Sequence, residues 1–279
     1  MRIDGYRYTW RLPLLAWQTL FFIGPLMLMV AMSFWLVRNY RMTPDFIMNN
    51  WDRMLSRGYF WDAYEVTFIR ATVAALLATV IAFPAAYALA FKVSDSVRRW
   101  AIFFLIVPFF TSYLVRIYAW QVLLAESGPI NAVLGFGGVG PFTMLNSGFG
   151  AMVGYMTLVL PLVIILQTAS LAGIDKNLIE AAWNLGASPR ETLLKVIIPA
   201  AKVGLILGAV FAFILSFGDF VSPFYLGGSK PPTLSILIID TTKSGQQWPR
   251  AAVVAIMMIV TLFVVAFAAV AAAYGRRRG

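Results

Sequence analysis

The 279-residue sequence contains no cysteine and no histidine, and only 12% of its residues are charged. Without cysteine the chain has no disulfide and no thiolate metal ligand. Without histidine it also lacks imidazole metal sites and the triads that use Cys or His. The remaining carboxylates, Ser, Tyr and Lys form no convincing catalytic cluster. We therefore expect no catalytic residue, no metal site and no cofactor bound by this chain.

The scarcity of charge also bears on the class of protein, because soluble domains carry about twice this share. Hydrophobic residues make up 61% of the chain, which indicates an integral membrane protein. The net charge of +10 could suggest nucleic acid, but in a membrane protein it usually reflects cytoplasmic anchoring residues. We expect no nucleic-acid partner. The basic start, residues 1–13, precedes an apolar run without a small-residue cleavage site, which predicts a retained first span.

Apolar stretches of the roughly 20 residues needed to cross a bilayer occur six times. They are 13–37, 64–91, 100–124, 147–171, 200–226 and 251–274. The sequence shows no internal repeat, so it predicts one all-α membrane domain over residues 1–279. Prolines within these spans predict kinks, because neighbouring helices can satisfy the carbonyls that a proline frees. They are Pro25, Pro84, Pro108, Pro161 and Pro223.

The distribution of basic residues predicts the orientation. Thirteen of the 22 Lys and Arg lie in the two terminal segments and in the two loops on the same side, seven lie in the other loops, and Arg70 and Arg116 lie within spans. Basic residues favour the cytoplasmic side, so both termini are predicted there. Of the outer segments, 38–63 is predicted to lie along the membrane surface and the glycine-rich 125–146 to form a re-entrant or surface loop.

The segment 175–199 is the most regular water-facing stretch. Asp175 suits the N-cap of a helix over 176–185, and Gly186 can end that helix in the left-handed conformation. An apolar stripe follows the helical spacing. Its members are Leu178, Ala181, Ala182 and Leu185. The stripe is compatible with a helix resting on the membrane interface and with a helix that docks into a partner's groove.

A second helix start follows at once. Ser188 is the predicted N-cap, Pro189 suits the first helical position, and Glu191 lies three residues after the serine, as in a capping box. The segment is therefore predicted to fold as helix, glycine turn and helix.

The order Glu-Ala-Ala, three residues, Gly, and a later Pro resembles the EAA loop of membrane subunits of bacterial ABC importers. The matching residues are Glu180, Ala181, Ala182, Gly186 and Pro199, with Val196 and Ile198 where Ile and Leu are usual. In that family the loop is a coupling helix that sits in a cleft of the ATPase subunit. The resemblance therefore implies an ATPase contact. It would involve Glu180, Ala181, Ala182, Gly186, Ser188 and Pro189.

Four ionisable side chains lie inside predicted spans: Glu65, Arg70, Arg116 and Asp219. Such residues are costly in hydrocarbon and are usually functional or paired. With the predicted topology all four lie toward the outer side, where they could line one vestibule. They could equally form ion pairs, Arg116 with Asp219 or Arg70 with Glu65, that hold the spans together.

Aromatic residues surround two of these charges. Asp219 has Phe217 and Tyr225 nearby in sequence, and a carboxylate among ring faces could bind an organic cation. Arg116 is accompanied by Tyr113, Tyr118 and Trp120, and Glu126 lies near the predicted outer mouth. Aromatic rings are also ordinary core residues, so a substrate pathway and simple packing both remain open.

Three further segments resemble permease subunits of spermidine/putrescine-type importers. These are the stretch around 107–120, residues 218–228 and the approach to the last span at 247–252. The resemblance implies a six-span type I ABC importer permease in a bacterial cytoplasmic membrane, with a polyamine or similar small cation as cargo. It also implies a second permease, two ATPase subunits that bind ATP and Mg²⁺, and a soluble substrate-binding protein outside.

Two alternatives stay open. The same importer class could carry an opine, a betaine, iron or sulfate on a similar scaffold. A secondary transporter would need no ATPase, but the chain lacks the inverted repeat typical of many such transporters.

Overall fold

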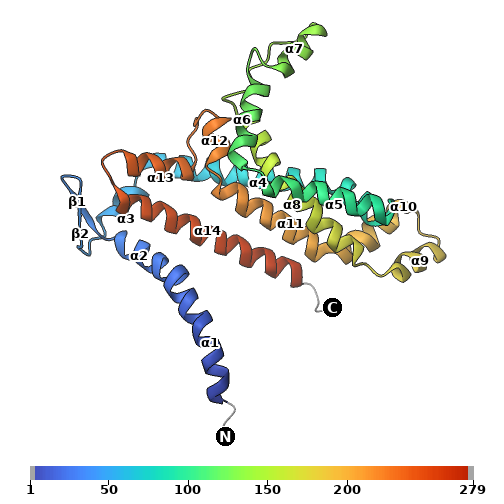
Figure 1. The fold of residues 1–279 in the computed structure, drawn as a ribbon, viewed down its shortest axis with the longest axis horizontal. Coiled ribbons are helices and arrows are strands. Elements are labelled where there is room, and N and C mark those ends of the chain that lie inside the picture. The colour runs from blue at the N-terminus through green and yellow to red at the C-terminus, as the bar shows by residue number, and fades with distance from the viewer. Residues whose placement is uncertain (1–3, 276–279) are drawn as a thin grey trace. The chain divides into compact units, whose positions relative to one another are not determined.

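The computed structural model describes residues 4–275, with side chains described from Arg11 on, and is mostly helical (Figure 1). The predicted basic residues Arg2 and 276–278 lie outside the described residues. Contacts group the chain into two compact units, unit 1 (1–62 with 237–260) and unit 2 (63–236 with 261–279). The single membrane domain expected for 1–279 stays a prediction.

Unit 1 contains the first apolar segment and a small hairpin. Its elements are α1 (Asp4–Gln18), a π-helical segment (Thr19–Ile23), α2 (Gly24–Met32), β1 (Leu36–Arg38), β2 (Arg41–Thr43) and α3 (Asn49–Leu55). The span predicted to reach residue 37 ends as a helix at Met32. The side chain of Asn50 donates to the carbonyls of Ser33 (2.9 Å) and Trp35 (2.8 Å), which holds the chain in a non-helical path beyond the end of α2. The predicted surface segment 38–63 thus contains a hairpin and a helix.

Unit 2 holds most of the long helices. The remaining elements are α4 (Gly58–Phe91), α5 (Asp95–Phe110), α6 (Tyr113–Leu124), α7 (Pro129–Phe136), α8 (Gly148–Ala172), α9 (Lys176–Asn184), α10 (Pro189–Thr192), a π-helical segment (Leu193–Ile197), α11 (Ile198–Gly218), α12 (Val221–Tyr225), α13 (Leu234–Lys243) and α14 (Trp248–Tyr274). Helices α4, α13 and α14 contribute residues to both units. Within unit 2, α8 packs mainly on α11, and the buried Gln167 of α8 donates to the carbonyl of Thr79 in α4 at 3.1 Å.

Five apolar helical segments in the described part of the chain are long enough to cross a bilayer, and a bent pair can supply a sixth crossing. The five are Arg11–Met32, Gly58–Phe91, Gly148–Ala172, Pro189–Gly218 and Trp248–Tyr274. This agrees with the six predicted apolar spans and with the predicted all-α membrane fold.

The third predicted span, 100–124, is not one helix. Segments Asp95–Phe110 and Tyr113–Phe136 meet at an angle of 95°. Thr111 has an extended backbone and its amide and hydroxyl both donate to the carbonyl of Pro108. The chain therefore breaks three residues after the proline, where the sequence predicted only a kink. Figure 1 shows α6 and α7 projecting away from α5, α8 and α11. Helix α7 lies within the predicted loop 125–146.

The fifth predicted span, 200–226, is broken as well. Helix α11 ends at Gly218, Asp219 has an extended backbone (ψ 127°), and α12 then begins at Val221. At its other end the helical run is longer than predicted and begins at Pro189. The second helix of segment 175–199 is therefore continuous with the span.

Candidate functional site

The loop between α8 and α11 folds as the sequence predicts. The carboxylate of Asp175 accepts a hydrogen bond from the amide of Asn177 at 2.9 Å and caps α9. Gly186 follows α9 with φ +82°, a left-handed conformation that favours glycine because it lacks a Cβ. The predicted helix and its glycine stop are confirmed.

The second helix start is a complete capping box. The hydroxyl of Ser188 accepts from the amide of Glu191 at 3.3 Å, and the carboxylate of Glu191 accepts from the amide of Ser188 at 3.1 Å. Pro189 is the first helical residue. Lys195 also donates to Glu191 at 3.0 Å. These bonds satisfy amides that a helix N-terminus leaves free, so the turn has a defined geometry.

The predicted apolar stripe on α9 divides into two faces. Ile179 and Ala182 are buried, and Ile179 packs in a cluster with Ala90 of α4 and Ile197. Leu178 and Leu185 are exposed, at 52% and 88%. Ala182 lies at the edge of the stripe, which explains why it faces inward. Helix α9 is thus anchored through one face, and its second, apolar face is exposed beside Glu180.

A second polar site lies at the break between α11 and α12. Asp219 is 8% exposed. Its Oδ1 accepts from the amide of Val221 (2.8 Å), and its Oδ2 accepts from the hydroxyl of Tyr113 (2.8 Å) and the amide of Ser222 (3.3 Å). The hydroxyls of Tyr113 and Ser222 are also hydrogen-bonded to each other. The carboxylate therefore joins α6 to the start of α12.

The guanidinium groups of the two arginines within the predicted spans are only partly hydrogen-bonded. The guanidinium of Arg116 lies 5.5 Å from the centre of the Tyr113 ring and donates through Nη1 to the carbonyl of Thr157 at 3.2 Å. Its Nε, and Nη1 of Arg70, are buried and have no hydrogen-bond partner within the described chain. A buried donor without an acceptor lowers the stability of the fold. An additional acceptor beside either guanidinium would therefore be favourable.

Neither of the two ion pairs that the sequence left open forms in the described part of the chain. The ion pairs there are Asp95–Arg98, in which the arginine is half-buried, and Glu191–Lys195, which is exposed. The pairs of Arg116 with Asp219 and of Arg70 with Glu65 are absent there. Asp219 takes hydroxyl and amide donors instead, and Glu65 is exposed.

The aromatic residues predicted for the pathway have different surroundings. The rings of Tyr118 and Tyr225 meet edge-on at 5.3 Å, and Gln121 donates to the carbonyl of Tyr225 at 2.8 Å. Trp120 packs against the apolar cluster of α6 and α12. These contacts extend the junction between the two broken spans.

Phe217, by contrast, is fully buried and stacks on Phe213 at 5.3 Å, so it is a core residue of α11. Glu126 is exposed. The structure thus brings Tyr113, Arg116 and Asp219 together, whereas Phe217 and Glu126 make no described contact with that group.

Two residues of this junction were not predicted. Ser222 is completely buried, and Gly154 of α8 lies so close to it that a Cβ at this glycine would be 2.5 Å from the Ser222 hydroxyl. The spacing of Asp219 and Ser222, three residues apart before a short helix, is a capping signal that could have identified the serine. No local signal identifies Gly154, because its contact comes from a distant helix.

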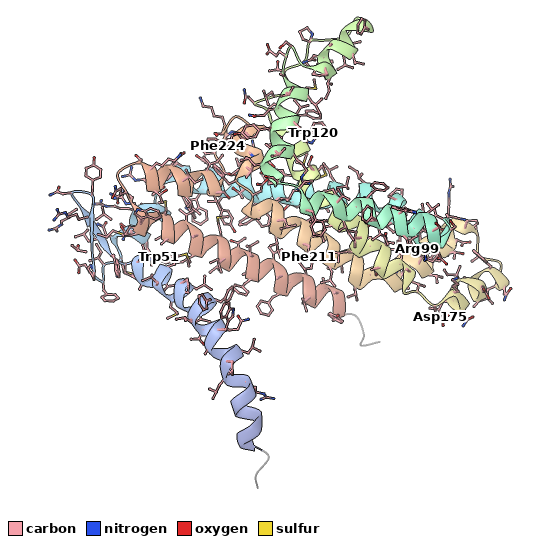
Figure 2. All side chains as sticks on the ribbon, in the orientation of Figure 1. Trp51, Arg99, Trp120, Asp175, Phe211 and Phe224 are labelled. Carbon is pink, nitrogen blue, oxygen red and sulfur yellow. The ribbon has the colours of Figure 1, made fainter. Side chains whose placement is uncertain are left out.

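The two sites lie at opposite ends of the long helices in unit 2. Figure 2 shows Trp120 and Phe224 at one end and Arg99 and Asp175 at the other. Helix α9 follows Asp175 directly, and the Asp219 junction lies between α11 and α12. Within the described residues no group of three or more acidic side chains could hold a metal ion.

Comparison with known sequences shows which protein family the chain resembles. The sequence profile of the binding-protein-dependent transport system inner membrane component matches residues 74–278. The chain is 29% identical over 253 residues to the spermidine/putrescine transport system permease protein PotB of Escherichia coli K12, covering 89% of this chain and 91% of that one. The PotB protein of Haemophilus influenzae is also 29% identical, with 90% and 88% covered.

The fold has a counterpart among solved structures. A chain of a bacterial ABC transporter involved in the import of the acidic polysaccharide alginate superposes with a TM-score of 0.79 at 16% identity, covering 99% of this chain and 97% of that chain. At this identity the similarity concerns the fold.

Proposed function

From the premise that this chain belongs to the family of binding-protein-dependent transport system inner membrane components, we propose that it carries polyamines across the bacterial inner membrane. It is a multi-pass permease subunit of the ABC importer class, with the type I permease fold. The observation that supports an ATP-driven role most directly is the capped loop 175–199, with its anchored α9 and left-handed Gly186.

The partners follow from this role. A second permease would complete the membrane pore, two ATPase subunits would bind ATP and Mg²⁺, and a soluble binding protein would deliver cargo on the other side. The basic residues predict that both termini and α9 face the ATPase side. The permease itself performs no covalent chemistry, and hydrolysis belongs to the ATPase partners.

Packing supplies a route from α9 to the spans. Ile179 sits in a cluster with Ala86 and Ala90 of α4, Leu171 of α8 and Ala201 of α11. An ATPase that moves the exposed face of α9 would therefore displace the ends of three spans together, because close-packed side chains transmit such shifts. Gly186 and the capping box at Ser188 fix the turn through which α9 joins α11.

The Asp219 junction is the proposed cargo-contacting region. Asp219 bonds to Tyr113 across two broken spans, and a cationic cargo that reached this carboxylate would compete with the tyrosine hydroxyl. Arg70 and Arg116 would then need hydrogen-bond acceptors from the protein. The carbonyl of Thr157 already accepts from Arg116. The names of the PotB relatives favour a polyamine as this cargo.

A second cargo class is favoured by one specific observation. Nη1 of Arg70 and Nε of Arg116 are buried and have no hydrogen-bond partner among the described residues, and guanidinium groups bind carboxylate or sulfate well. The same importer could therefore carry an anionic or zwitterionic solute.

The test is reconstitution of the complete transporter in proteoliposomes with ATP on the ATPase side. We expect accumulation of labelled spermidine that requires ATP and the binding protein. Accumulation of sulfate or a betaine in place of spermidine would reject the polyamine assignment. Equal flux without ATPase subunits would reject an ABC importer role.

A further inference from the structure

A cleft lies on unit 2 beside α9. It has a volume of about 730 Å³, which is in the range of sites that hold small ligands. Its walls come from the end of α4, the turn 92–95, the start of α5, α9 and the residues that follow Pro189. The cleft therefore lies where three of the long helices end on the side of the coupling loop.

The floor and the rim of the cleft differ in chemistry. Ala90, Ile179 and Ile197 are buried or nearly buried apolar residues. The charged residues on the cleft are Lys92, Asp95, Arg98, Lys176 and Glu180. A headgroup with an apolar tail fits such a surface better than a fully hydrated ion, because part of the lining is apolar.

Hydrogen bonds show which of these charges are already engaged. Arg98 donates to the carbonyls of Leu89 (2.7 Å) and Ala90 (3.2 Å) and pairs with Asp95 (3.2 Å). It thereby caps the C-terminus of α4 and neutralises Asp95. In the described chain Lys92 and Lys176 form no ion pair with an acidic residue. Opposed by Glu180 alone, they leave the cleft with an excess of positive charge.

Aromatic residues place the cleft at the level of the membrane interface. Trp100 lies one turn from the start of α5, is 61% exposed, and contacts Phe103 and Phe104. Exposed tryptophan is typical of the interface between lipid headgroups and hydrocarbon. The exposed residues Val97, Trp100 and Phe104 follow a spacing of three and four, which gives α5 an apolar strip suited to an acyl chain.

We propose that this cleft binds the phosphate-containing headgroup of an anionic phospholipid. Lys92 and Lys176 hold the headgroup, and the acyl chains lie along the apolar surface of the spans. Basic pockets between spans on the cytoplasmic side commonly take anionic headgroups. The bound lipid would touch Glu180 and Trp183 of α9. Lipid binding at this cleft is separate from transport, since it needs only the membrane location and would hold if the cargo assignment were wrong.

The experiment measures lipids retained by the purified full-length chain with native mass spectrometry. The probes are phosphatidylglycerol, which is anionic, and phosphatidylcholine, which is zwitterionic. We expect preferential retention of phosphatidylglycerol by the parent. In Lys92→Gln/Lys176→Gln its affinity should fall about twenty-five-fold, from about fivefold for each lysine near an anionic surface. Lys92→Arg/Lys176→Arg should retain it.

The matched control is Lys230→Gln/Lys243→Gln, which removes the same charge from the loop predicted to lie across the membrane. It should retain phosphatidylglycerol like the parent. Size-exclusion profiles check that each variant is folded, and the conservative arginine variant separates loss of charge from loss of structure.

Three outcomes would overturn the proposal. They are equal retention of the two lipids by the parent, unchanged affinity in the glutamine double variant, and displacement of phosphatidylglycerol by inorganic phosphate with the same lysine dependence. The last result would identify a site for a free anion. Because no ATPase or cargo is present, none of these outcomes depends on the proposed transport function.

Discussion

The hydroxyl of Tyr113 donates a 2.8 Å hydrogen bond to the buried carboxylate of Asp219. Both residues lie beside a break in a predicted span, Tyr113 at the first residue of α6 and Asp219 directly after α11. The bond therefore links the two places where the membrane helices of unit 2 depart from continuous spans. A movement of α6 relative to α11 and α12 therefore requires this hydrogen bond to break or to shift.

We predict that Tyr113→Phe lowers both stability and uptake. The change removes one donor from Asp219 and leaves Ser222 without its tyrosine partner, which should cost about 1–3 kcal/mol of unfolding free energy. Thermal unfolding in detergent and ATP-dependent uptake measure the two effects. The control is Tyr274→Phe at an exposed position. An unchanged melting temperature in Tyr113→Phe would show that the bond contributes nothing to the fold.

Gly154 permits the close approach of α8 to α12. A Cβ there would lie 2.5 Å from the Ser222 hydroxyl, so Gly154→Ala should destabilise the protein by about 1–3 kcal/mol through overpacking. Gly148→Ala in the same helix is the control, since open space surrounds that glycine. Equal unfolding temperatures for the two variants would contradict the predicted contact.

The sequence predicts the local geometry of segment 175–199 well. Asp175, Gly186 and Ser188 act through neighbours within a few residues, and capping preferences capture such interactions. The breaks at Thr111 and Asp219 were predicted less well. For Asp219 the reason is that one of its donors is distant in sequence, because Tyr113 reaches Asp219 only after α6 and α12 have packed together.

The charged residues within the predicted spans illustrate the same limit, namely that the sequence does not reveal partners that are distant along the chain. Hydropathy identifies Arg70, Arg116 and Asp219 as unusual, but it does not reveal their partners. The ion pair of Arg116 with Asp219, one of the two alternatives, is absent from the described chain, where a hydroxyl and amides supply the donors to Asp219. Gly154 carries no local signal, so its role comes from tertiary packing alone.

We predict that Gly186→Val uncouples ATP hydrolysis from transport. Its φ of +82° is strained for any residue with a Cβ and most for a β-branched one. The ATPase subunits should still hydrolyse ATP, while uptake per ATP should fall severalfold. Gly135→Val on α7 is the control, because that glycine has ordinary helical geometry and open surroundings. Normal uptake per ATP in Gly186→Val would reject the coupling role.

The absence of cysteine allows a direct test of orientation. Ser188→Cys should react with a membrane-impermeant thiol reagent from the cytoplasmic side, because the basic residues place segment 175–199 there. Ser229→Cys should react from the opposite side. Labelling of intact cells compared with inverted vesicles distinguishes the two. The reverse pattern would invert the predicted topology and place α9 away from the ATPase.

The sign of the cargo's charge determines which group at the junction binds it, the carboxylate of Asp219 or the guanidinium of Arg116. If the cargo is a polyamine, Asp219→Asn should reduce uptake at least tenfold, because it removes the charge with little change in volume and a charge-assisted contact is among the stronger hydrogen bonds. Glu126→Gln at an exposed site should have a smaller effect. If the cargo is anionic, Arg116→Gln should abolish uptake while Asp219→Asn retains it.

Because Arg116 also donates to the carbonyl of Thr157, a thermal unfolding measurement must accompany the Arg116→Gln variant. Loss of uptake with an unchanged melting temperature would assign the arginine to the cargo. A parallel loss of stability would instead assign it to the packing of α6 against α8.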